Sequence, residues 1–216
     1  AKRVLQPGVS GSWDDHHTCD PSVIEGSFTW KNTTYKYAMF FLSNMYGVYY
    51  NEIGVAFSND LDADSWVKYP QQIVKKTWSS EGDQEIGGGG KVRGVGQPSV
   101  VSLDGKGKLL LTYTVGDIGG TRIVWAEADF SNMDTYSIST PQTIVQTGLK
   151  AIDNQSQDYT CNSEFAIDKD ADKIVMIRPV QPMPSDYPNY LTSSLEIDYM
   201  NLSDFTNQRG SCNNWN

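Results

Sequence analysis

The segment Asp20–Ile24, with the sequence Asp-Pro-Ser-Val-Ile, decides the fold because it returns twice along the chain. It recurs as Gln97–Val101 and, in a more diverged form, within Cys161–Ile167. The aligned starts at residues 20, 97 and 162 lie 77 and 65 residues apart. Self-similarity at such a period is typical of repeat architectures, in which each repeat is one supersecondary unit. The sequence therefore predicts three structural units.

The same order of strand signals follows each start. A polar turn comes first, then a short apolar strand, a loop and an alternating strand, all rich in Val, Ile, Tyr, Phe and Thr. These strands are predicted at 37–41, 109–113 and 174–177, and at 53–57, 123–127 and 195–199. Two units close on a further strand signal, at Tyr69–Val74 and Thr140–Val145, and the third ends near Trp215. Because no stretch of ten residues has helical periodicity, the pattern indicates an all-β fold of antiparallel strands.

Four antiparallel strands per repeat are typical of the blades of a β-propeller. We therefore predict one β-propeller domain over residues 1–216, with blades at about 13–77, 92–148 and 159–216. A propeller ring closes with four or more blades. With three visible, we expect the domain to be incomplete and to belong to a longer chain.

Composition excludes several classes of partner. A net charge of -9 argues against nucleic acid, whose phosphates are bound by a basic face. No run of 18 apolar residues occurs, so no membrane span is expected. The cysteines Cys19, Cys161 and Cys212 lack Cys-x-x-Cys spacing, and we expect neither a metal site nor a cofactor. Glycosylation sequons at Asn32, Asn154 and Asn201 favour a secreted protein.

Candidate site residues lie where the repeats start. The innermost strand of a propeller blade begins beside the central channel, so polar residues there converge on one pocket. The corresponding positions are Asp20, Gln97 and the step from Asn162 to Glu164. Further candidate substrate-binding residues precede the first start or follow an apolar strand: Trp13, Asp15, His16, His17 and Arg178.

At these residues the chain resembles a known group. Asp20–Ile24 with Tyr35–Phe41 looks like the opening of the five-bladed β-propeller glycoside hydrolases, which are arabinanases, β-xylosidases and arabinofuranosidases related to invertase-type enzymes. Asn51–Leu61 with Trp66 is similar to their outer strands. The resemblance covers about three blades. It implies a secreted hydrolase that cleaves glycosidic bonds in polysaccharide or oligosaccharide.

The resemblance also implies roles for two carboxylates. Asp20 matches the general base, or the nucleophile of retaining members, and Glu164 is the best candidate for the general acid. Such chemistry needs one ionised and one protonated carboxyl group beside the sugar ring. The family uses a further aspartate, whose charge adjusts the pKa of the general acid. The chain departs from this pattern at Gln97, which cannot carry such a charge. It departs again at Asn162, which is the direct match to Asp20.

Each candidate has a structural alternative. Asp20 before Pro21 is also typical of a turn residue that accepts backbone hydrogen bonds. Glu164 at a strand edge is compatible with a solvated side chain, and His16 and His17 with a surface loop. The alternative for the whole chain is a non-catalytic carbohydrate-binding or structural propeller that has lost part of its catalytic set.

Overall fold

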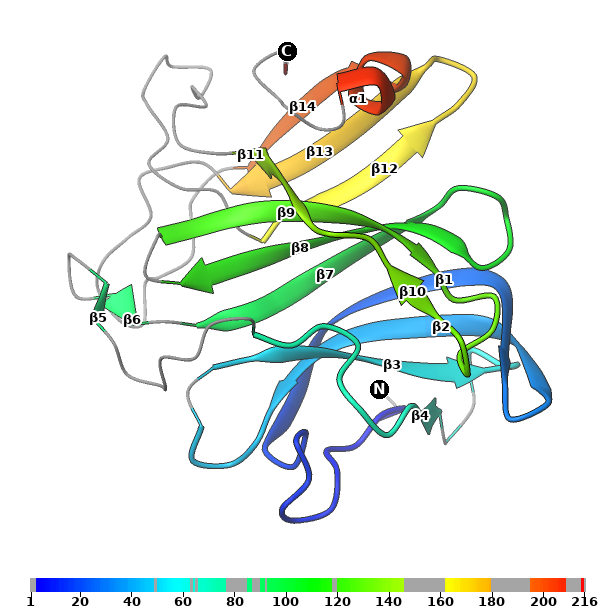
Figure 1. The fold of residues 1–216 in the computed structure, drawn as a ribbon, viewed down its shortest axis with the longest axis vertical. Coiled ribbons are helices and arrows are strands. Elements are labelled where there is room, and N and C mark those ends of the chain that lie inside the picture. The colour runs from blue at the N-terminus through cyan, green and yellow to red at the C-terminus, as the bar shows by residue number, and fades with distance from the viewer. Residues whose placement is uncertain are drawn as a thin grey trace.

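The computed structural model describes residues 3–48, 50–62, 64, 66–76, 93–117, 120–145, 162–179, 195–208 and 215, together with the backbone of 85–86 and 90–91. Its strands form three antiparallel sheets and one two-stranded hairpin. In Figure 1 the second sheet lies between the first and the third. The all-β, antiparallel class predicted from the sequence is therefore confirmed.

The first sheet has the strand order β1-β2-β3-β4, and the second has the order β10-β9-β8-β7 with β11 also on β9. The third sheet has the order β12-β13-β14. The strands of the first sheet are β1 (His17–Trp30), β2 (Thr33–Asn44), β3 (Glu52–Ser58) and β4 (Val67–Lys68). Those of the second are β7 (Gly94–Ser102), β8 (Lys108–Asp117), β9 (Gly120–Asp129), β10 (Ser137–Ile138) and β11 (Gln142–Val145). The remaining elements are β5 (Glu85–Ile86) and β6 (Gly90–Lys91) in the hairpin, then β12 (Glu164–Asp168), β13 (Lys173–Pro179), β14 (Leu195–Asn201) and α1 (Leu202–Gln208).

The outermost strands differ from the sequence prediction. In the first sheet, β4 spans two residues, and the predicted strand at 69–74 is reduced to a single bridge between Ile53 and Val74. In the third unit, α1 directly follows β14, and its seven residues are too few for the helical periodicity sought in the sequence. No described helix is long and apolar enough to cross a membrane. The described sheets do not close on themselves, so the propeller arrangement and its blade boundaries stay predictions.

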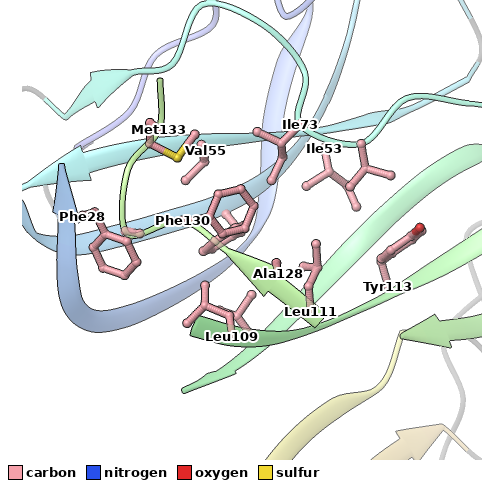
Figure 2. Close-up of a cluster of buried hydrophobic side chains, with 14 of the residues drawn as sticks. Phe28, Ile53, Val55, Ile73, Leu109, Leu111, Tyr113, Ala128, Phe130 and Met133 are labelled. Carbon is pink, nitrogen blue, oxygen red and sulfur yellow. The ribbon is translucent and has the colours of Figure 1, made fainter. Parts of the chain in front are cut away.

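Two apolar clusters hold the three sheets together. The larger lies between the first and second sheets, and Figure 2 shows Phe28, Val55, Leu111 and Phe130 meeting there. The smaller joins the second and third sheets and includes Leu110 and Met176. Successive side chains of a strand point to opposite faces. The continuous apolar run at the start of β8 therefore reflects a sheet that is buried on both faces.

Buried serines connect successive sheets through hydrogen bonds. The hydroxyl oxygen of Ser22 in β1 accepts the backbone N–H of Val100 in β7 at 3.2 Å. One repeat later, the hydroxyl oxygen of Ser99 accepts the backbone N–H of Phe165 in β12 at 3.0 Å. Because both serines follow an X-Pro step, the repeated sequence motif also carries the repeated connection between sheets.

Trp13 is half-buried and packs against a small apolar cluster on the first sheet. Its ring stacks on Phe41 with centroids 5.9 Å apart, on the face of the first sheet that points away from the second. Gly54 makes this packing possible, since a Cβ atom there would lie 2.6 Å from the indole ring. The N-terminal segment thereby covers the outer face of the first sheet.

Arg178 is likewise held inside the protein. We expected it to reach the channel, but its side chain is 0% exposed and lies in ion pairs. Its Nε donates to Asp198 at 2.6 Å, and its Nη2 donates to Glu196 at 2.8 Å. The side chains of Arg178 and Glu196 are cross-strand partners, so strand pairing itself brings the charges together.

The serine connection leads to a stability prediction. Replacing Ser22 with Ala leaves the buried N–H of Val100 without its acceptor, and we expect the free energy of unfolding to fall by about 1–3 kcal/mol. The control is Ser102→Ala, which removes an acceptor in the exposed turn at Gly105. Urea unfolding monitored by tryptophan fluorescence compares the two, and an equal loss in both variants would contradict the connecting role.

The buried ion pairs lead to a second prediction. Arg178→Ala leaves Asp198 and Glu196 without this cation, and we expect about 3–5 kcal/mol of destabilisation. The control is Lys36→Ala, whose pair with Glu25 is 3.5 Å long and whose side chains are 51% and 66% exposed. We expect no measurable change in stability for that surface pair. Urea unfolding again provides the measurement, and a loss below about 1 kcal/mol for Arg178→Ala would refute the structural role.

Candidate functional site

The three repeat starts share an unusual backbone conformation. Asp20, Gln97 and Asn162 have φ angles of 49°, 52° and 53°, in the left-handed region that non-glycine residues rarely adopt. In β1 and β7 the strand register shifts at these residues, between Cys19 and Ser22 and between Gly96 and Ser99. Such β-bulges redirect side chains and are frequent next to active sites.

These bulges direct their side chains into one cavity, which we call the strand-start cavity. It has a volume of about 180 Å³. Its lining comes from all three repeats, although Asp20 and Glu164 are 144 residues apart in the sequence. The lining residues are Asp20, Pro21, Gln97, Pro98, Asn162, Ser163 and Glu164. Of the predicted site residues, Asp20, Gln97 and Glu164 thus lie together.

Asp20 carries one of the two carboxylates. The residue is exposed, but the protein around its carboxyl group removes part of its hydration and raises its pKa above the ordinary value. The positive charge of protonated His17 opposes this effect. The neighbouring Cys19 has a free thiol, whose pKa desolvation and the charge of Asp20 raise to about 11. The thiol is therefore protonated at neutral pH and is a poor nucleophile.

Glu164 carries the other carboxylate. Desolvation raises its pKa above the ordinary value, and a hydrogen bond from Ser99 partly offsets the rise. The Ser99 hydroxyl donates to Oε1 of Glu164 at 3.0 Å while its oxygen accepts the N–H of Phe165. Because the Ser99 hydroxyl donates one hydrogen bond and accepts another, it is held in one orientation. It therefore positions the Glu164 carboxylate at the cavity.

Gln97 is engaged in the cavity wall. Its side-chain oxygen accepts the backbone N–H of Asn162 at 3.0 Å, and the same N–H lies 3.1 Å from the hydroxyl oxygen of Thr114. The amide oxygen of Gln97 therefore connects the second and third repeats. This leaves the amide NH₂ group as its donor toward a ligand.

The candidates Asp15 and His16 precede β1, and their contacts stabilise that segment. Asp15 accepts the backbone N–H groups of Tyr46 and Gly11, each at 2.6 Å, and these hydrogen bonds lower its pKa. His16 is exposed, and its Nδ1 lies 3.2 Å from the amide oxygen of Asn44. Neither residue is part of the cavity lining.

His17 does not line the cavity either, but its charge acts on the carboxyl group of Asp20. Desolvation and the nearby His16 lower the pKa of His17, while Asp20 raises it. Its backbone carbonyl also accepts the hydroxyl of Ser43, which holds the start of β1. The sequence does not distinguish His17 from His16. In the fold, His16 is exposed, whereas the charge of His17 acts on Asp20.

Asn162 was given no functional role from the sequence, and Ser99, which contacts Glu164 from outside the lining, was not a candidate at all. The signal for Asn162 was present, since it aligns directly with Asp20 and Gln97. Ser99 follows Pro98 as Ser22 follows Pro21, but a serine that holds a carboxylate of another repeat has no signature in the sequence. The cavity thus presents two carboxylates and two amides, a set that can bind sugar hydroxyls and exchange protons.

Comparisons with known proteins support the fold. No protein-family model and no curated protein matches the sequence. The chain is similar in structure to a family 117 glycoside hydrolase from the marine bacterium Zobellia galactanivorans. The TM-score is 0.53 and the identity 14%, over 92% of this chain and 56% of that one.

An α-L-arabinofuranosidase from Lactobacillus brevis matches with a TM-score of 0.50 and 12% identity, over 88% of this chain and 55% of that one. This chain therefore spans about half the length of either protein. Its expected resemblance to glycoside hydrolases, which the Asp20–Ile24 repeat suggested, is confirmed as a similarity of fold.

Proposed function

We propose that the protein is a glycoside hydrolase, or the part of one that carries the repeats described here, and that it acts on polysaccharide or oligosaccharide. One observation carries the proposal: Asp20 and Glu164, from the first and third repeats, line the same cavity. The similarity of fold to two glycoside hydrolases adds support. We further propose that the protein acts outside the cell as a five-bladed β-propeller.

The two carboxyl groups are suited to different roles. Glu164 is the general acid that protonates the leaving oxygen, because desolvation raises its pKa and favours the protonated form. Asp20 is the general base or nucleophile, because the charge of His17 favours its ionised form against the effect of desolvation. One ionised and one protonated carboxyl group are what glycoside hydrolysis requires.

A second candidate function is the binding of carbohydrate without cleavage. It is favoured by the two amides, Gln97 and Asn162, which occupy the positions equivalent to Asp20 in the second and third repeats. Amides donate and accept hydrogen bonds to sugar hydroxyls but do not transfer protons as carboxyl groups do. Under this alternative, Asp20 also serves as a ligand for hydroxyl groups.

The hydrolase proposal predicts the effect of isosteric substitutions. Asp20→Asn and Glu164→Gln each remove one proton-transferring group, and we expect kcat/KM to fall by roughly 10²–10⁴-fold in either variant. The assay uses 4-nitrophenyl α-L-arabinofuranoside and arabino-oligosaccharides. Because neither side chain lies in the apolar core, we expect the melting temperature to change by less than about 3 °C.

Matched controls are Asp170→Asn and Glu25→Gln, which make the same chemical changes at exposed positions outside the cavity. Both should keep full activity. Binding of arabino-oligosaccharides by the wild-type chain, with no cleavage of any substrate, would replace the hydrolase proposal by the binding alternative. Activity retained in Asp20→Asn with a large loss of stability would assign Asp20 to the turn instead.

The charge of His17 leads to a pH prediction. Activity should rise with pH as Asp20 ionises and fall as Glu164 loses its proton, in a window shifted above the ordinary carboxyl range. His17→Asn removes the charge that lowers the pKa of Asp20, so the rising limb of kcat/KM should move to higher pH. His16→Asn removes a charge that lowers the pKa of His17, and the rising limb should stay or move to lower pH. A shift to higher pH in both variants would contradict this assignment.

A further inference from the structure

A second cavity lies where the first and second sheets meet. Its volume is about 490 Å³, within the usual range for small-molecule sites. The two cavities share no lining residue. We call this second cavity the basic pocket, because Lys75, Lys76 and Arg122 all lie on its wall.

The floor of the basic pocket is apolar. It consists of Ile73 and Val74, which follow the first sheet, and of Val95, Val115 and Val124 in the second sheet. All five side chains are buried and belong to the larger apolar cluster. An aliphatic floor of this kind favours the ring or short chain of an organic ligand through removal of apolar surface from water.

Three cationic side chains surround that floor in a protein whose net charge is -9. Arg122 donates two hydrogen bonds to Asp117, at 2.8 and 2.7 Å, so its charge is largely balanced. Lys76 lies over the ring of Tyr50 with its Nζ 3.6 Å from the centroid. For Lys75 no hydrogen bond or ion pair is found within the described parts of the chain. The lysines therefore supply the positive charge that a ligand would meet.

Tyr113 gives the pocket a directed donor. The residue is 4% exposed and lines the pocket, and its hydroxyl makes no hydrogen bond with any described residue. In Figure 2 its oxygen points away from the other labelled side chains of the cluster. Desolvation raises the pKa of Tyr113 to about 12, so the hydroxyl keeps its proton at neutral pH. The hydroxyl is not among the described buried side-chain atoms that lack a partner, so it is accessible from the pocket and can donate to a ligand there.

We propose that the basic pocket binds an organic carboxylate with an apolar body the size of one ring, whose carboxylate accepts the Tyr113 hydroxyl and lies near Lys75 and Lys76. The apolar floor disfavours inorganic anions, and the lysines favour an anion over a neutral molecule. This site is independent of the proposed hydrolase activity, because it uses none of the residues of the strand-start cavity.

The test is an NMR titration of the full chain with benzoate, using benzamide as the neutral molecule of nearly the same shape. We expect benzoate to bind and benzamide to bind at least about tenfold more weakly, since a hydrogen bond to a charged group is worth about 1.5–3 kcal/mol. Added salt should weaken the binding of benzoate. Absence of benzoate binding, or equal affinities for the two molecules, would overturn the proposal.

Variants locate the binding in this pocket. Tyr113→Phe removes only the hydroxyl, and the Kd for benzoate should rise roughly threefold to tenfold; Tyr35→Phe makes the same change outside the pocket and should leave it unchanged. Lys75→Gln with Lys76→Gln should weaken binding by a similar factor. The double control Lys106→Gln with Lys108→Gln lowers the net charge equally at a distant turn and should have no comparable effect. If each variant and its control change the Kd alike, benzoate binds elsewhere and the proposal fails.

Discussion

The burial of the second sheet on both faces is the constraint on which the rest of the structure depends. Leu109 and Leu111 of β8 pack toward the first sheet, while Leu110 packs toward the third. A sheet with two apolar faces is stable only when both are covered. The first and third sheets cover these faces, and in this stack the three repeat starts, each with a left-handed backbone conformation, meet at one cavity.

The same stacking creates the electrostatics of the strand-start cavity. Asp20 and Glu164 are exposed residues of the first and third repeats. The surrounding protein removes part of the hydration of their carboxyl groups and raises both pKa values. Ser99 belongs to the second repeat but holds a carboxylate of the third, so the site depends on the contact between sheets.

The faces of the outer sheets differ in how they are covered. The N-terminal segment with Trp13 covers the first sheet, whereas the third sheet leaves Leu195 and Ile197 65% and 66% exposed. Arg178 was expected to reach the channel because it follows a strand that is otherwise apolar. Its side chain is instead buried inside the protein, where the carboxylates of Asp198 and Glu196 partner it. Trp13 is half-buried and stacks on Phe41.

The sequence by itself determined the all-β class, the three repeats and the positions of their starts, because strand periodicity and repeated motifs are local patterns. It also indicated Asp20, Gln97 and Glu164 as neighbours through the alignment of the repeats. Only the tertiary structure decided that His17 acts on Asp20, that Gln97 serves as a connection and that Arg178 is buried in ion pairs. These roles depend on contacts between residues far apart in the chain, and the burial and direction of a side chain follow from such contacts rather than from its neighbours in sequence.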